Sequence, residues 1–370
     1  MKNIPFFNYS ALFQENSQEL TKIFKNVSSR GAFIMQDDLV QFEENLAKYT
    51  NVKYAVGVAN ATDALQLLLI AGGISSGDEV IFCSHTMVAT ASAIAFTGAT
   101  PVPVDVDKDH MIDVNSIEAA ITPKTKAIMP TQLNGRMSNM DEILRIAKKY
   151  NLQIYEDSAQ ALGAKFKGKS AGSFGIGGCI SFYPAKVLGC FGDGGAVLTN
   201  NKDIYNRIKL LRDHGRGEDG NVSIWGYNSR LDNLQAAILN FFFQTYDKTI
   251  KRRRAIATLY HENLKGLKSI YLPPPPESKG NHFDIYQNYE IEANRRDELK
   301  EYLVNNGIGT LLQWGGKAVH EFRELGFTQS LPYTENVMRN SLMLPLNMTI
   351  TDDDVKYIAN IIWKFYNAKN

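Results

Sequence analysis

The sequence has few cysteines, no excess of charge of one sign and no long apolar run. Its three cysteines, Cys83, Cys179 and Cys190, are odd in number and lack metal-finger spacing, which argues against a secreted disulfide framework and against a structural zinc site. Forty basic and 39 acidic side chains leave a formal charge of +1. The chain therefore has no overall field that would attract nucleic acid or anionic lipid.

No apolar run reaches the roughly 18 to 20 residues that a membrane span needs. The N-terminal stretch MKNIPFFNYS has one lysine followed by only four apolar residues, too few for the core of a signal peptide. With 370 residues, 44% of them hydrophobic and 21% charged, the chain can bury a large core. We expect a folded cytoplasmic enzyme with no membrane and no nucleic-acid partner.

Short apolar segments alternate with longer amphipathic ones between residues 54 and 199. Segments such as YAVGVA, EVIFC and LQIYED have the pattern of buried strands, and the stretches between them have the pattern of helices. Strands without polar alternation, separated by helices, are typical of a mainly parallel sheet that helices cover on both faces. We predict an α/β fold with a large domain over residues 26–250, which should bind ligands at the carboxyl ends of its strands.

A second, smaller domain is expected over residues 251–370. The proline-rich run at 272–280 cannot sustain a helix or a central strand, so we expect an exposed linker there. After it, FDIYQNYEIEA could form a strand pair and RRDELKEYLVNNGIG a helix that ends at Gly307, which suggests an α+β domain. We expect residues 1–25 to pack on this domain. The basic turn KRRR at 251–254 is expected to be a solvated helix face.

One lysine has an unusual setting. Lys186 follows the apolar segment CISFY and precedes the glycine-rich turn LGCFGDGGA, where backbone can approach a ligand closely. A lysine amine becomes a nucleophile toward a carbonyl when burial lowers its pKa from ~10.4 to about 7 or 8. Lys186 is therefore a candidate for the Schiff-base lysine that pyridoxal phosphate requires. Taken alone, a lysine before a glycine turn is more often a solvated side chain.

The other requirements of pyridoxal phosphate each have a candidate. Asp157, at the end of LQIYED, could pair with the ring nitrogen and keep it protonated, and Gln160 could lie beside it. A helix that begins near Ala61 and Thr62 would present free backbone N–H groups to the phosphate. Ser181 could add a hydroxyl group to the same phosphate site.

Taken in order, several stretches resemble the DegT/DnrJ/EryC1/StrS family of nucleotide-sugar aminotransferases, which have fold type I of the pyridoxal-phosphate-dependent enzymes. The matching stretches include FEENLAKYTNVKYAVGVANATDALQLLL, EDSAQALGA, SFYPAKVLGCFGDGGA, GYNSRLDNLQAAIL and RRDELKEYLVNNGIGT. The resemblance covers nearly the whole length. It implies transfer of an amino group from L-glutamate to the keto group of a nucleotide-linked sugar, with pyridoxamine phosphate as the intermediate.

The resemblance also implies roles for individual residues. Lys186 would form the Schiff base and shuttle the proton, Asp157 would pair with the pyridine nitrogen, and Gln160 would lie near the phenolic oxygen. Thr62 and Ser181 would hold the phosphate. Because Lys186 is present, the resemblance does not favour the branch of the family that has histidine at this position and performs dehydration.

Two further positions follow from the same resemblance. In this family the asparagine of a GYNSR-like motif reaches the phosphate of the neighbouring subunit's cofactor, which implies that Asn228 completes a site at a homodimer interface. Many relatives carry an aromatic residue that stacks on the pyridine ring, where this chain has Met87 within HTMVAT.

The motifs around Lys186 and Asn228 look closer to enzymes that aminate a C3 keto sugar than to those acting at C4. The residues expected near the sugar are Tyr183, Gln132, Gln313, Trp314, Lys317 and His320. The histidines show no metal spacing, so no metal site is expected. A C4 keto sugar, a keto cyclitol acceptor and a non-catalytic regulator that keeps the fold are the alternatives.

Overall fold

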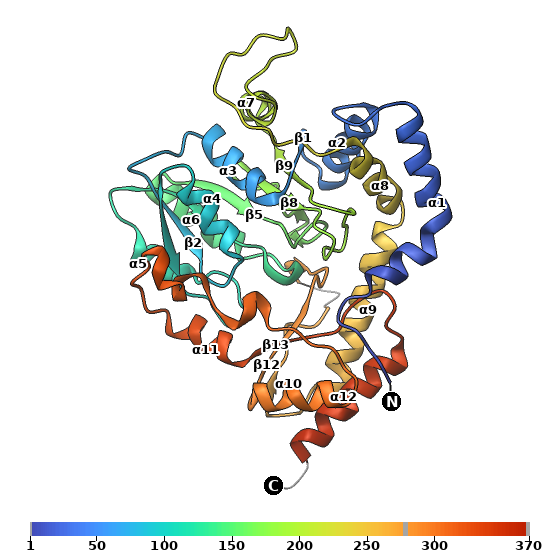
Figure 1. Ribbon diagram of the computed structural model, residues 1–370. Coiled ribbons are helices and arrows are strands. Elements are labelled where there is room, and N and C mark those ends of the chain that lie inside the picture. Colours follow the sequence, from blue (N-terminus) through green and yellow to red (C-terminus); the bar gives the residue numbers. More distant parts are fainter. Residues whose placement is uncertain (1, 277–279, 368–370) are drawn as a thin grey trace.

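A seven-stranded sheet forms the centre of the computed structural model, which describes residues 2–276 and 280–367 (Figure 1). Its strand order is β1-β9-β8-β5-β4-β2-β3. The strands are β1 (Tyr54–Val58), β2 (Glu79–Cys83), β3 (Thr100–Val104), β4 (Thr125–Met129), β5 (Gln153–Asp157), β8 (Gly177–Ser181) and β9 (Gly195–Thr199). Neighbours from β3 to β8 are parallel, whereas β9 is antiparallel to β8 and β1. The predicted α/β fold is confirmed.

Helices cover both faces of this sheet. On one face lie α3 (Ala61–Ala71), α4 (Val88–Ala95) and α7 (Lys202–Arg212), and on the other lie α2 (Asp37–Thr50), α5 (Val114–Ala120), α6 (Met140–Tyr150) and α8 (Asn233–Phe243). Ile81 and Cys83 belong to one buried cluster and Val80 and Phe82 to the other, because successive strand residues point to opposite faces. In the part of the chain that the structure describes, no helix is long and apolar enough to cross a membrane.

The C-terminal part of the chain builds its own core around a three-stranded sheet. The strands are β10 (Ile270–Tyr271), β12 (Tyr289–Ala293) and β13 (Ser341–Leu344), and the helices are α9 (Tyr246–Leu264), α10 (Arg296–Asn305), α11 (Pro332–Asn340) and α12 (Asp352–Asn367). Tyr260 of α9, Ile291 of β12 and Ile358 of α12 share one buried cluster. By contrast, Val337 and Met338 of α11 join the core of the large domain, so α11 connects the two parts.

The predicted strand pair in FDIYQNYEIEA is wrong. β11 (His282–Phe283) pairs with β6 (Lys165–Phe166), which in turn pairs with β7 (Lys169–Ser170) in the large domain. β12 pairs instead with β10 and β13. The two segments therefore belong to different sheets, and residues 284–288 cross from one domain to the other. Of the linker expected at 272–280, residues 277–279 lie outside the described part of the chain.

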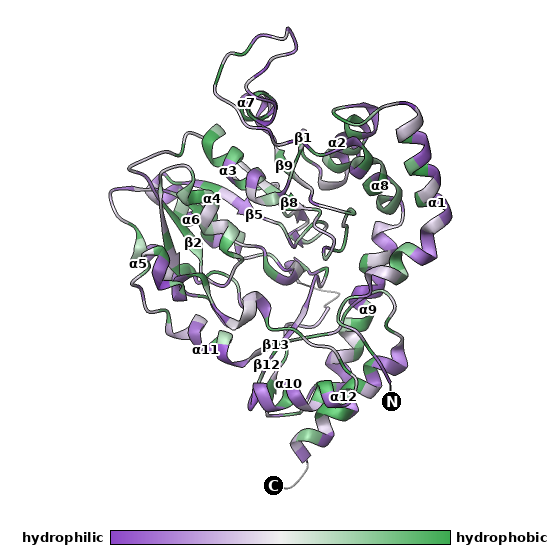
Figure 2. Ribbon diagram, viewed as in Figure 1, coloured by the Kyte–Doolittle hydropathy of each residue, from purple (hydrophilic) through white to green (hydrophobic). Residues whose placement is uncertain are grey.

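The N-terminal residues divide between the two domains. Ile4 pairs with Ile308 and joins the core of the C-terminal part, and Lys2 forms an ion pair of 2.7 Å with Asp354. Helix α1 (Tyr9–Ser29) packs against α8 instead. Its purple and green residues alternate in Figure 2, as expected for a helix with one apolar face. The expected packing of residues 1–25 on the smaller domain therefore needs correction, since α1 lies on the large domain.

The basic turn at 251–254 also needs correction, because it is not simply a solvated face. Arg253 is only 7% exposed. Arg252 forms an ion pair of 2.6 Å with Asp352, and Arg254 donates a hydrogen bond to the carbonyl oxygen of Asp284. These side chains tie α9 to segments that are distant in sequence.

Candidate functional site

A cavity of about 520 Å³ opens at the carboxyl ends of the sheet strands. The large domain contributes the residues that follow β1, β2, β4, β5 and β8, and the smaller domain contributes Leu311, Trp314 and Met343. Loops and helix N-termini converge at this edge, where open α/β sheets bind their ligands. The volume is in the range of sites for small organic ligands.

Lys186 reaches this cavity from the turn that follows β8. Its peptide N–H donates to the carbonyl oxygen of Tyr183 at 2.8 Å, which closes the turn. Burial lowers the pKa of Lys186 to about 8, although the charge of Asp157 acts in the opposite direction. An amine with this pKa is partly neutral near pH 7.5 and can attack a carbonyl carbon. A lowered pKa is what a Schiff-base lysine requires.

Asp157 ends β5 and lines the same cavity as Lys186. Its carboxylate accepts one hydrogen bond from Thr90 Oγ1 at 2.6 Å and another from the N–H of Ala159 at 3.2 Å. Burial raises the pKa of Asp157, while these hydrogen bonds and the charge of Lys186 lower it. A cation beside this carboxylate would favour its ionised form. A protonated pyridine nitrogen is such a cation.

Thr90 belongs to a chain of buried hydroxyl groups that sequence reasoning missed. Thr131 Oγ1 donates to Thr86 Oγ1 at 3.1 Å, and a hydrogen bond of 2.7 Å joins Thr86 to Thr90. The chain connects the residues after β4 and β2 to Asp157 at the end of β5. Its signal in the sequence is the spacing of four between the threonines of HTMVAT, which can place two side chains on one face of a helix start.

The N-terminus of α3 forms another wall of the cavity. The side chain of Asn60 caps this helix, and the backbone of Ala61 and Thr62 lies at the cavity. β9 passes directly behind it, because a Cβ on Gly195 would lie 2.4 Å from the carbonyl carbon of Asn60. N–H groups at a helix N-terminus bind anions. Ser181 lines the cavity beside them at the end of β8.

Several other predicted residues also line the cavity. They are Met87, Gln160, Tyr183, Gln313 and Trp314. Gln160 is fixed by the backbone N–H of Asn134, which donates to its Oε1 at 2.8 Å. Met87 is 49% exposed and presents a thioether where many relatives would present an aromatic ring. Sequence reasoning missed Phe6 and Phe7, which line the cavity from the N-terminal segment.

Three residues predicted near the sugar do not line this cavity. Gln132 is fully buried and donates to Glu156 Oε2 at 2.7 Å. His320 is also fully buried, with its Nδ1 2.7 Å from Ser84 Oγ. Lys317 is exposed on the surface. These three residues therefore do not share the cavity of Lys186 and Asp157, and their contact with the sugar stays a prediction.

Asn228 also lies outside the cavity of its own chain. It is exposed and pairs with Asp213 at the base of a protruding segment, drawn yellow-green at the top of Figure 1. Within this segment Trp225 is 97% exposed and Val222 is 66% exposed. Large exposed apolar side chains are typical of surfaces that bind another protein.

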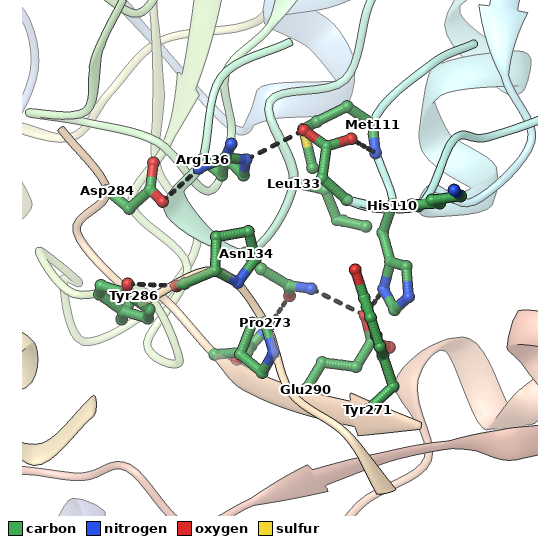
Figure 3. A pocket seen from close by; sticks show the side chains of 14 residues that line it. His110, Met111, Leu133, Asn134, Arg136, Tyr271, Pro273, Asp284, Tyr286 and Glu290 are labelled. Carbon is green, nitrogen blue, oxygen red and sulfur yellow. Dashed lines mark hydrogen bonds and ion pairs between the residues drawn. The ribbon is translucent and has the colours of Figure 1, made fainter. Parts of the chain in front are cut away.

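A second polar cluster lies where the two domains meet, beside the pocket drawn in Figure 3. Glu290 Oε2 accepts hydrogen bonds from Asn134 Nδ2 at 2.9 Å and pairs with His110 Nδ1 at 3.0 Å and His85 Nε2 at 3.2 Å. Among residues 2–276 and 280–367, these histidines and Glu290 form a group close enough to hold a metal ion. Their mutual hydrogen bonds already explain the arrangement, so the geometry requires no metal.

The charge of His110 depends on its two carboxylate neighbours. Its Nε2 lies 3.2 Å from Glu292 Oε1, opposite the contact with Glu290. Burial lowers the pKa of His110, but the hydrogen bonds and charges of Glu290 and Glu292 outweigh it and raise the pKa to about 10. An imidazolium that donates to both carboxylates therefore joins β12 to the large domain at neutral pH.

We expect His110→Gln to destabilise the protein more at low pH than at high pH. A folded-state pKa of about 10 means that the contribution of the imidazolium is complete below an unfolded pKa of ~6.5 and disappears as the pH rises toward 10. The free energy of unfolding should fall by about 3 kcal/mol near pH 6 but by only about 1 kcal/mol above pH 10. Urea denaturation at both pH values measures the difference.

The control is Asn240→Ala on α8, because Asn240 cannot titrate and donates a hydrogen bond to the carbonyl oxygen of Asp38 at 2.9 Å. Its effect on the free energy of unfolding should not change between these pH values. An equal loss for His110→Gln at both pH values would contradict the charged state of His110.

Comparisons with known proteins agree with this architecture. The model of the DegT/DnrJ/EryC1/StrS aminotransferase family matches residues 14–363. The chain is 38% identical to dTDP-3-amino-3,4,6-trideoxy-alpha-D-glucose transaminase of Streptomyces venezuelae, covering 93% of this chain and 91% of that protein. It is 36% identical to the "Pleiotropic regulatory protein" of Geobacillus stearothermophilus, covering 98% of this chain and 99% of that protein. The crystal structure of S. venezuelae DesV in complex with a ketimine intermediate matches with a TM-score of 0.95 at 35% identity, over 100% of both chains.

Proposed function

Because this chain belongs to the DegT/DnrJ/EryC1/StrS aminotransferase family, we propose that it transfers an amino group from L-glutamate to the C3 keto group of a nucleotide-linked deoxysugar. The predicted family, the sugar transaminase activity and the dependence on pyridoxal phosphate are confirmed. The observation that carries the assignment of the site is that Lys186 and Asp157 line one cavity together with the N-terminus of α3.

The side chains of this cavity fit pyridoxal phosphate. Lys186 would bond to its aldehyde carbon, Asp157 would form an ion pair with its ring nitrogen, and Ala61, Thr62 and Ser181 would hold its phosphate. The raised pKa of Asp157 supports this placement, because burial leaves the carboxylate in need of a cation. When bound, the cofactor supplies the electron sink through which an amino group passes between two carbon skeletons.

The remaining cavity residues have supporting roles in this proposal. Gln160 would lie beside the phenolic oxygen, and the thioether of Met87 would contact the ring face. The Lys186 amine, with a pKa of about 8, can both accept and return a proton near neutral pH. It would move this proton between the substrate carbon and the cofactor carbon in both halves of the reaction.

We expect Lys186→Ala to abolish amino transfer while the protein remains folded. The purified protein should show a visible absorbance band with pyridoxal phosphate and should release 2-oxoglutarate from L-glutamate. Lys186→Ala should lose the band, and its rate should fall by about 10³-fold or more, because no other lysine of the described residues lines the cavity. Lys165→Ala is the control, because Lys165 is the exposed residue of β6, and it should retain both signals. A normal band in Lys186→Ala would remove Lys186 from this role.

The acceptor is proposed from the wall of the cavity and from a relative. Tyr183, Gln313 and Trp314 offer polar groups, while Leu311 and Met343 offer apolar surface suited to the carbon-bound hydrogens of a deoxysugar. The Streptomyces venezuelae relative is named for a 3-amino sugar, which supports C3 over C4. The product would be an amino sugar for a surface polysaccharide or other glycoconjugate, made in the cytoplasm.

A panel of TDP-, UDP- and GDP-linked 3-keto and 4-keto sugars tests the acceptor. The best 3-keto sugar should exceed the best 4-keto sugar by about tenfold or more in kcat/KM, which corresponds to about 1.4 kcal/mol of transition-state binding. The reverse order would favour the C4 alternative. If no nucleoside diphosphate binds or inhibits, a keto cyclitol becomes the better acceptor. If no sugar of the panel is accepted but 2-oxoglutarate is still released from glutamate, the proposed reaction with the amino donor is supported. That result would also exclude a purely regulatory role.

We also propose that the active unit is a homodimer in which Asn228 contacts the cofactor phosphate of the neighbouring subunit. The exposure of Asn228, its place outside its own cavity and the exposed Trp225 nearby support this proposal. A symmetric dimer would use the same contact twice.

Mixing two impaired variants, at a pyridoxal phosphate concentration too low to load Asn228→Ala, tests whether Asn228 acts across the interface. Lys186→Ala should be inactive alone, and Asn228→Ala should bind pyridoxal phosphate more weakly. After unfolding and refolding together in equal amounts, heterodimers would contain one intact site, so about a quarter of the wild-type activity should return. No recovery in a dimer that has demonstrably mixed would place Asn228 in its own chain's site.

A further inference from the structure

Gln287 lies in the segment that crosses from β11 to β12 and reaches the turn that carries Lys186. It is 6% exposed. Its side-chain Oε1 accepts a hydrogen bond from the N–H of Val187 at 2.9 Å, and its Nε2 donates to the carbonyl oxygen of Ala185 at 2.8 Å. One side-chain amide therefore bonds to the backbone on both sides of Lys186.

This arrangement restricts the backbone of Lys186 itself. The carbonyl before Lys186 and the N–H after it are both held by the amide of Gln287, as groups of a neighbouring strand would hold them in a sheet. The N–H of Lys186 is used as well, in its hydrogen bond to Tyr183 at 2.8 Å. With these groups fixed, little backbone rotation remains at Lys186, and the direction in which its side chain leaves the turn is set.

Gln287 is in turn held by two other segments. Its N–H donates to the carbonyl oxygen of Asn134 at 2.9 Å. Its carbonyl oxygen accepts a hydrogen bond from Arg253 Nη2 at 2.6 Å, while Arg253 Nε donates to the carbonyl oxygen of Tyr286 at 2.8 Å. The backbone on both sides of this glutamine is therefore fixed before its side chain reaches Lys186.

Arg253 has an unusual environment for a cation. It is buried on α9, and its hydrogen-bond partners within the described residues are the carbonyl groups of Tyr286 and Gln287, with no carboxylate paired to it. Burial lowers the pKa of Arg253 to about 10. Burial of an unpaired cation is unfavourable, so its presence is best explained by what it positions.

We propose that Gln287, supported by Arg253, is a positioning residue that fixes the backbone of Lys186 and directs its amine into the cavity. This inference rests on the proposed role of Lys186 as the residue that bonds to the cofactor. α9 and the crossing segment belong to the smaller domain, whereas Lys186 belongs to the large domain. The side-chain amide of Gln287 therefore connects the smaller domain to the backbone of Lys186, so the position of that domain affects the direction of the amine.

Gln287→Met tests the proposal, because it keeps the length of the side chain and removes both hydrogen bonds. Hydrogen exchange of the peptide spanning 183–190 should become about tenfold faster or more, since the N–H of Val187 loses its acceptor. After removal of the cofactor, capture of added pyridoxal phosphate should be roughly tenfold slower at pH 7. The midpoint of its pH profile should rise by about one pH unit, because a freer amine reaches water and its pKa moves toward ~10.4.

Asn233→Leu is a matched control. Asn233 is a fully buried amide on α8 that accepts a hydrogen bond from the N–H of Leu39 at 2.9 Å and donates to the carbonyl oxygen of Ala32 at 2.8 Å. This variant loses the same kind of contact away from Lys186. It should speed exchange around Leu39 and leave the 183–190 peptide and the midpoint of capture at their wild-type values.

Two results would overturn the proposal. One is that Gln287→Met leaves both the exchange of 183–190 and the midpoint of capture unchanged, and the other is that Asn233→Leu changes them equally, which would indicate a general loss of stability. If Gln287→Met does not fold, Gln287→Ala removes both hydrogen bonds with a smaller side chain. It should change both measurements in the same direction, and no change would overturn the proposal. If the wild type captures no pyridoxal phosphate, the proposed function fails. Hydrogen exchange of the 183–190 peptide still tests whether Gln287 fixes the backbone around Lys186.

Discussion

The buried carboxylate of Asp157 is the constraint around which the site is arranged. Moving a carboxylate out of water costs several kcal/mol. The hydrogen bonds from Thr90 and Ala159 each return about 1.5 to 3 kcal/mol, yet burial still keeps the pKa of Asp157 above its usual value. Lys186 cannot supply the missing charge and also act as a neutral nucleophile. In the proposed function, the protonated pyridine ring would be a second cation that favours the ionised form of Asp157.

This requirement extends into the fold through the strand ends. Parallel strands bring the residues after β2 and β4 to the same edge as Asp157, so Thr86 and Thr131 can build the hydroxyl chain that ends at its carboxylate. On the phosphate side the antiparallel strand β9 has a different role. Only glycine at position 195 allows β9 to pass so close behind the start of α3. The parallel strands therefore position the residues proposed to lie near the cofactor ring, and the antiparallel strand β9 supports the helix start proposed to hold its phosphate.

Much of this site could be predicted from the sequence, because its residues stand at strand ends that local patterns reveal. The sequence was less informative about which side of an extended segment each side chain faces. Side chains alternate along an extended segment, so once Asp157 faces the cavity its neighbour Glu156 faces away. In the same manner Thr131 takes the cavity side and Gln132 turns to meet Glu156. This alternation could have shown, before the structure was known, that Gln132 does not share the cavity of Asp157.

Other features depend on contacts that no local pattern encodes. His320 is fixed by Ser84, 236 residues away, and Glu290 pairs with His110 across 180 residues. The helix start at Thr62 could be placed by its capping residue and composition. The crossing of the chain between two sheets at 284–288 could not be placed, because the pairing partner of β11 lies far away in β6.

The crossing segment also explains why the cavity has a defined shape in a single chain. Along residues 284–290, Asp284 pairs with Arg136 at 2.6 Å and Glu290 of β12 pairs with His110 at 3.0 Å (Figure 3). Between them, Gln287 bonds to the turn of Lys186. These contacts form within one chain, and they hold the two domains together once the chain has folded. The relative position of the two domains, and with it the direction of the Lys186 amine, is therefore set by folding and not by the arrival of the substrate.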